Sequence, residues 1–129
     1  MTNNTRVTYA DLFNATHKPI PIILKNTTDD NKKTMGKIMK ATESVFTNGQ
    51  IVDGELNEKY ADEEFDIETL RQAFQKQGFG SDTYPIIRIQ SYCKHFLVIK
   101  DNPEQEAKNH AIKQKATPAL DKLFIALDH

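Results

Sequence analysis

The feature of this sequence that most constrains its fold is a pair of neighbouring segments, residues 84–90 and 94–100, both rich in Ile, Val, Phe and Tyr. This composition is typical of β-strands, and the short polar connection between the segments predicts an antiparallel hairpin over about 84–100. The four apolar residues 96–99 would point to both faces of the pleat, which indicates a central strand covered on both sides. Pro19 and Pro21 favour extended backbone, so an edge strand is expected at about 20–25.

Elsewhere, apolar residues recur with the 3.6-residue period of an α-helix. Helices are predicted from the capping residue Thr8 through about residue 14, and at about 31–46, 66–77, 103–116 and 118–128. Asp66 and Asn102 are typical N-caps, and Gly78 is suited to the left-handed residue that ends a helix. The predicted fold class is therefore α+β, with a small antiparallel sheet covered by four or five helices.

The size of the chain predicts one compact domain over residues 1–129, because a domain of this length buries roughly two thirds of the surface that its unfolded chain exposes. No apolar run approaches the length of a membrane span, and no signal-peptide pattern opens the chain. Cys93 is the only cysteine, so no disulfide can form within one chain. We therefore expect a cytoplasmic protein that does not interact with membranes.

Charge is distributed very unevenly along the sequence. Residues 51–70 hold eight Asp or Glu and one Lys, a balance of −7, whereas residues 1–50 and 71–129 each have a balance of +3. Asp66 and Glu68 are explained by the first turn of a predicted helix, where acids are favourable. Six acidic residues have no predicted structural role: Asp53, Glu55, Glu58, Asp62, Glu63 and Glu64. Since an acidic patch can steer a cationic partner, these six predict a docking surface for a basic protein.

Two alternative kinds of site are also open. Lys33, Lys37 and Lys40 share the polar face of the predicted 31–46 helix and could contact nucleic-acid phosphates, as could the basic C-terminal region around Lys108, Lys113 and Lys115. Lys outnumbers Arg fourteen to three, however, and base-specific readout favours Arg. Cys93 and His95 would lie on one face of a strand, as the nucleophile and base of a small enzyme would. No third catalytic group accompanies them, and the remaining histidines, His17, His110 and His129, are expected to be surface residues.

No metal-ligand spacing or cofactor-binding motif is present in the sequence, so neither a metal nor a cofactor is expected. The function that fits best is a small non-enzymatic binding protein: an inhibitor, an immunity protein or a regulatory accessory factor. The many Lys and Asn residues and the few Arg residues suit a bacterial accessory protein.

Overall fold

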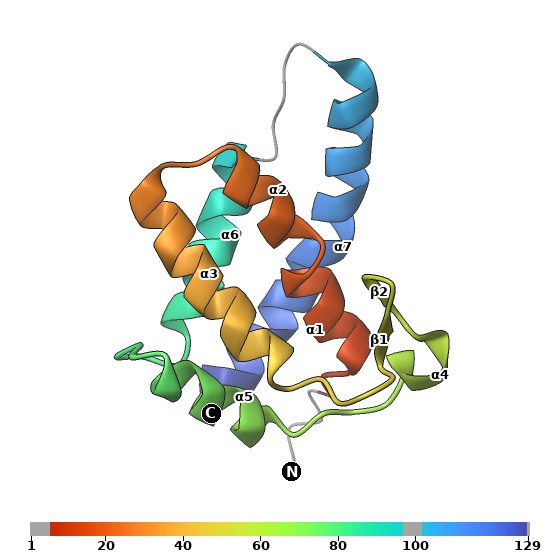
Figure 1. Cartoon of the computed structure of the whole chain (residues 1–129), viewed down its shortest axis with the longest axis vertical. Coiled ribbons are helices and arrows are strands. Elements are labelled where there is room, and N and C mark those ends of the chain that lie inside the picture. Colours follow the sequence, from red (N-terminus) through yellow and green to blue (C-terminus); the bar gives the residue numbers. More distant parts are fainter. Residues whose placement is uncertain (1–5, 97–101, 129) are drawn as a thin grey trace.

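The computed structural model describes residues 6–96 and 102–128, and for residues 95 and 96 it describes the backbone only. Over these residues the chain is mostly helical, with one antiparallel hairpin, and it belongs to the predicted α+β class (Figure 1). The elements, in order, are α1 Tyr9–Thr16, α2 Pro19–Lys25, α3 Asp29–Glu43, β1 Ile51–Val52, β2 Glu55–Leu56, α4 Glu58–Ala61, α5 Ile67–Lys76, α6 Tyr84–Phe96 and α7 Pro103–Asp128. The described helices number seven, more than the four or five predicted.

The predicted strand at 20–25 is wrong, because this segment is helix α2. Pro19 is the first residue of α2 and Pro21 the third, and the first N–H groups of a helix have no partner within the helix anyway. Both prolines are therefore compatible with a helical turn. Ile20 and Ile23 are completely buried, three residues apart, as one face of a helix requires.

The predicted hairpin at 84–100 is also wrong over the residues that the structure describes, since α6 occupies residues 84–96. Residues 97–100, which made up most of the expected central strand, lie outside the described ranges. Ile86, Ile89 and Cys93 are buried at helical spacing. The β-rich composition predicted the wrong element because the spacing of these residues, and not their type, decides which of them reach the core.

Several predicted helix ends agree with the structure, although α3 is Asp29–Glu43 and not the predicted 31–46. Thr8 and Asp11 form a capping box at the start of α1, and Asp66 caps α5 through its side chain. Asn102 accepts a hydrogen bond from the backbone N–H of Gln105 at the start of α7. The two helices expected on either side of Pro118 form one helix that contains this proline.

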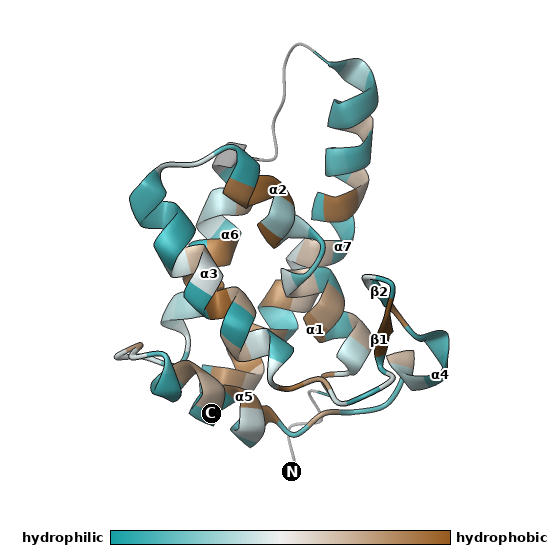
Figure 2. Ribbon diagram, viewed as in Figure 1, coloured by the Kyte–Doolittle hydropathy of each residue, from teal (hydrophilic) through white to brown (hydrophobic). Residues whose placement is uncertain are grey.

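One hydrophobic cluster draws buried residues from α1, α2, α3, α5, α6 and α7. The pairing of α1 with α7 is the most extensive contact between elements, and the N-terminal part of α7 extends beyond the other helices (Figure 1). Hydrophilic residues dominate that part of α7 and the outer side of α3 (Figure 2). Arg71 of α5 ties the end of α7 in place, because its guanidinium donates to the Leu127 carbonyl at 3.1 Å and pairs with Asp82 at 2.9 Å.

Candidate functional site

The acidic segment begins with the hairpin, in which Ile51 pairs with Leu56 and Val52 with Glu55. The two residues between the strands, Asp53 and Gly54, have φ angles of 53° and 79°. Two consecutive positive φ angles define the two-residue turn that best matches the twist of a hairpin, and Asp-Gly is one of its preferred sequences. Asp53 therefore has a structural role that the sequence prediction missed, although its side chain is exposed.

The rest of the segment follows the hairpin along α1. Asn57 caps the short helix α4, Glu58 is the first residue of that helix, and Asp62 follows its end. The carbonyl of Glu63 accepts a hydrogen bond from the backbone N–H of Tyr9 at 3.0 Å, and Glu64 forms an isolated β-bridge with Thr8. We name residues 51–64 the acidic lobe; it lies beside α1, at the right of Figure 1.

Two of the six predicted carboxylates form ion pairs with residues outside the lobe. Glu55 pairs with Lys18 at 2.8 Å, and Glu64 pairs with Arg6 at 3.2 Å. The other four side chains form no ion pair or hydrogen bond within the described ranges: Asp53, Glu58, Asp62 and Glu63. All six carboxylates are exposed, so the lobe presents negative charge to solvent.

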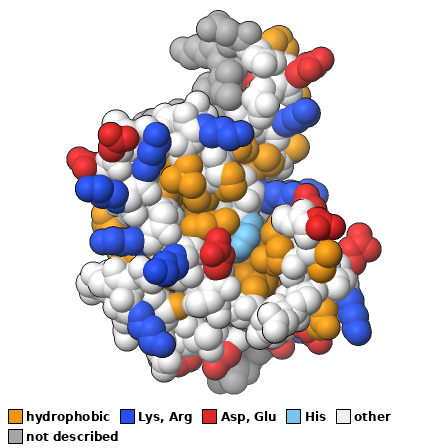
Figure 3. Space-filling model, in the orientation of Figure 1, with side chains coloured by type: hydrophobic (Ala, Val, Ile, Leu, Met, Phe, Trp, Pro, Cys, Tyr) orange, Lys and Arg blue, Asp and Glu red, His pale blue; other side chains and the backbone are white. Residues whose placement is uncertain are grey.

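The predicted lysine residues lie on α3 as expected. Lys33, Lys37 and Lys40 are exposed, while Met35, Ile38, Ala41 and Thr42 of the same helix are buried. The structure adds Lys76 of α5, which faces Lys40 across a groove between the two helices. We name these four residues the lysine face. The sequence prediction missed Lys76 because the packing of α3 beside α5 cannot be read from either helix alone. In Figure 3, Lys and Arg side chains predominate over α3, whereas acidic side chains lie over the hairpin and α4.

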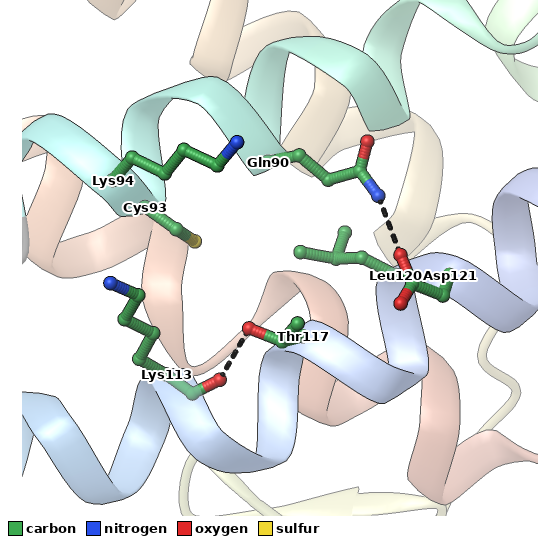
Figure 4. A pocket seen from close by; sticks show the side chains of 7 residues that line it. All are labelled: Gln90, Cys93, Lys94, Lys113, Thr117, Leu120 and Asp121. Atoms are coloured by element: carbon green, nitrogen blue, oxygen red, sulfur yellow. Dashed lines mark hydrogen bonds between the residues drawn. The ribbon is translucent and has the colours of Figure 1, made fainter.

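Cys93 borders a cavity of about 330 Å³ between α6 and α7. Figure 4 shows the seven lining residues, with a hydrogen bond of 3.0 Å from Gln90 to Asp121 that joins the two helices: Gln90, Cys93, Lys94, Lys113, Thr117, Leu120 and Asp121. Burial raises the pKa of the Cys93 thiol to about 11, against an opposing effect of Lys113. The thiol is therefore protonated at neutral pH, the reverse of what a cysteine nucleophile needs.

The pairing of Cys93 with His95 was predicted from the alternation of a strand. The backbone at both positions belongs to α6, so that alternation does not apply. The side chain of His95 lies outside the described part of the structure. The cavity at Cys93 is consequently better described as a gap beside a structural thiol than as a catalytic centre.

His17 is not a simple surface residue, in contrast to the interpretation from the sequence. Its ring stacks on Phe13 with the ring centroids 5.1 Å apart and makes a T-shaped contact with Phe46 at 5.0 Å, and its Nδ1 lies 3.0 Å from the Thr16 hydroxyl. Its Nε2 is buried without a hydrogen-bond partner. Burial lowers the pKa of His17 to about 4, because the charged imidazolium would lose hydration there.

Among the side chains that the structure describes, in residues 6–94 and 102–128, no group of three or more His, Cys, Asp or Glu is placed to hold a metal ion. In the same ranges, no helix combines the length and the apolar character that a bilayer crossing needs. No family model, curated protein or solved structure matches the chain. The features that characterise the described structure are a mostly helical α+β fold, an acidic lobe and a lysine face.

Proposed function

We propose that the chain is a small non-enzymatic binding protein that docks on a basic protein partner through the acidic lobe. The observation that carries this proposal is the set of four exposed carboxylates, Asp53, Glu58, Asp62 and Glu63, whose side chains have no partner within the described ranges. Repulsion between like charges lowers the stability of the folded chain. A cationic surface that covers the segment would offset this repulsion.

A protein partner is favoured by an exposed apolar residue within the lobe. The side chain of Val52 is 52% exposed, and it directly precedes Asp53 at the hairpin turn. A protein interface combines an apolar contact with a charged rim, where the charges guide association and the apolar group excludes water. Val52 with the surrounding carboxylates has this composition. A bacterial inhibitor, immunity protein or accessory factor acting in the cytoplasm fits the proposal.

The test is a quantitative capture experiment on extract from the native host, with three immobilised proteins. These are the wild type, the lobe variant Glu58→Lys/Asp62→Lys/Glu63→Lys, and a charge-reversed control on α3, Lys33→Glu/Lys37→Glu/Lys40→Glu. All six substituted side chains are exposed and unpaired within the described ranges, so both variants should fold.

We expect a basic protein that the wild type and the α3 control retain, that the lobe variant loses, and that elutes as salt is raised. The captured protein should then bind purified wild type directly, and Val52→Ser should weaken that binding. Retention of the same proteins by the wild type and the lobe variant would refute the proposal.

A further inference from the structure

The lysine face has features that the proposed docking of the acidic lobe does not use. Between residues 31 and 42, the charged residues of α3 are all lysines, because its carboxylates, Asp29, Asp30 and Glu43, lie at the two ends of the helix. Lys32 pairs with Asp29 at 4.0 Å, but Lys33, Lys37 and Lys40 form no ion pair within the described ranges. These three lysines are spaced four and three residues apart and span about 10 Å of the helix.

A groove of about 280 Å³ continues this face from α3 to α5. Lys40 and Lys76 lie on its two walls, and the lining contains hydroxyl and amide groups but no carboxylate: Lys40, Ala41, Ser44, Thr69, Gln72, Ala73, Lys76 and Gln77. Lys76 is exposed and also forms no ion pair within the described part of the chain. Two cations without a counter-charge, Lys40 and Lys76, therefore border a groove whose hydroxyl and amide groups can donate hydrogen bonds to an anion, and Lys33 and Lys37 continue the positive charge along α3.

We propose that the lysine face binds the phosphate backbone of double-stranded DNA without reading its sequence. Lysine ammonium groups contact phosphates as point charges, whereas base readout favours the bidentate geometry of arginine, and no arginine lines this groove. Binding of single strands uses aromatic side chains on which bases stack, and the groove lining includes no aromatic residue. The lining therefore favours a duplex backbone.

The distribution of charge over the molecule also favours an orientation in which the lysine face meets the DNA. The acidic side chains over the hairpin and α4 lie at the right of Figure 3, whereas the carboxylates of α3 lie only at the two ends of that helix. A polyanion would be repelled by the acidic lobe and attracted to the lysine face. The chain would then contact DNA and a basic protein through two separate surfaces.

The dependence of DNA affinity on salt concentration follows from counterion release. If each of the four lysines neutralises one phosphate, the logarithm of the binding constant should fall against the logarithm of salt concentration with a slope of about −3.6. Between about 50 and 200 mM salt this amounts to a loss of affinity of roughly a hundredfold. Two duplexes of unrelated sequence should bind equally well.

The experiment is a fluorescence anisotropy titration of a labelled DNA duplex with the full chain at several salt concentrations. The variant Lys33→Gln/Lys37→Gln/Lys40→Gln should reduce the slope to about −0.9, and Lys76→Gln alone should reduce its magnitude by about 0.9. The matched control Lys59→Gln/Lys108→Gln/Lys115→Gln removes three exposed lysines from α4 and α7 and should retain the wild-type slope.

Equal loss in the two triple variants, tighter binding to single-stranded DNA or to duplex RNA, or no salt-dependent binding by the wild type would overturn the proposal. The charge-reversed lobe variant Glu58→Lys/Asp62→Lys/Glu63→Lys should still bind the duplex, so failure of the lobe to dock on a protein is distinguishable from failure of the lysine face. Far-ultraviolet circular dichroism of every variant verifies that the substituted chains are folded.

Discussion

The lysine face and the acidic lobe carry opposite charge, and they are attached to the rest of the molecule in different ways. Helix α3, which bears three of the four lysines, buries Met35, Ile38, Ala41 and Thr42 on its other side. In the lobe, α4 buries no residue, and β1 and β2 are two residues long each. The lysine face lies on two helices that bury residues in the core, whereas the lobe is held by hydrogen bonds and ion pairs at the edges of the lobe.

This difference determines how substitutions in each region should be interpreted. A charge change at Lys33, Lys37 or Lys40 removes no ion pair or hydrogen bond within the described ranges, so its effect on binding can be measured with little change in stability. A change at Glu55 or Glu64 alters both charge and an ion pair that attaches the lobe. The lobe should also open locally at a lower free energy than α3, because it has fewer buried apolar contacts.

The largest expected effect tests the attachment of α3 to the core. Ile38 is completely buried, so Ile38→Ala should lower the free energy of unfolding by about 2–5 kcal/mol through lost burial and the cavity left behind. Urea denaturation followed by circular dichroism measures this loss. The neighbouring exposed change Lys37→Gln should stay within about 0.5 kcal/mol of the wild type. Similar values for both variants would mean that α3 is not anchored as described.

A pH-dependent loss of stability is expected from the aromatic cluster of Phe13, His17 and Phe46 at the C-terminal end of α1. The pKa of His17 is about 4 in the folded chain, and in the unfolded chain it should be near 6.5. Between these values the unfolded chain binds more protons, so stability should fall as pH is lowered from about 6.5 to about 4. Above pH 6.5 this residue should have no effect.

The measurement is the urea midpoint as a function of pH for the wild type and His17→Gln. The difference between the two curves isolates His17 from the carboxylates that titrate at lower pH. His110→Gln provides the control, because His110 is exposed on α7. A wild-type curve parallel to that of His17→Gln between pH 6.5 and 4 would contradict the buried, neutral state of this imidazole.

The parts of the fold that were predicted correctly depend on local chemistry. Thr8, Asp66 and Asn102 cap helices through hydrogen bonds to backbone groups two or three residues away, so the sequence contains the whole interaction. Gly78 was predicted by the same logic: its φ is 88°, and the Phe79 N–H donates to the Phe74 carbonyl while the two rings meet edge to face. Such motifs need no knowledge of tertiary packing.

The errors arose at segments whose secondary structure is decided by tertiary packing. Segments 20–25 and 84–96 contain many β-branched residues, but burial at helical spacing outweighs their strand propensity.

The Asp53-Gly54 turn was predictable, because Asp-Gly between short apolar segments is a strong hairpin signal. The exposure of the six lobe carboxylates followed from their charge, whereas the pairing of Glu55 with Lys18, thirty-seven residues away, required the fold. The approach of Lys76 to Lys40 is equally non-local.

Two glycine substitutions, one in the lobe and one in α3, should change stability by smaller amounts and in opposite directions. Gly54 has a φ of 79° in the lobe, so Gly54→Ala should destabilise the hairpin by about 1–2 kcal/mol. Gly36 lies within α3 and has open space around its missing Cβ, so Gly36→Ala should stabilise that helix by about 0.5–1 kcal/mol. Hydrogen exchange measures both: faster exchange in residues 51–56 of the first variant, slower exchange in α3 of the second. Loss of protection throughout the chain in Gly54→Ala would contradict the local opening of the lobe.

The smallest expected effect concerns the ion pair between Lys18 and Glu55. Both side chains are partly exposed, 37% and 65%, so solvent screens their attraction and the pair should contribute only about 0.2–1 kcal/mol. A double-mutant cycle with Lys18→Gln and Glu55→Gln measures this coupling, which should decrease at high salt. A coupling well above 1 kcal/mol would mean that charge attaches the lobe to the N-cap residue of α2, and Glu55 could then not be free for a partner. A small coupling would leave Glu55 able to exchange Lys18 for a cationic partner at little cost, so that the docking surface would comprise five carboxylates and not four.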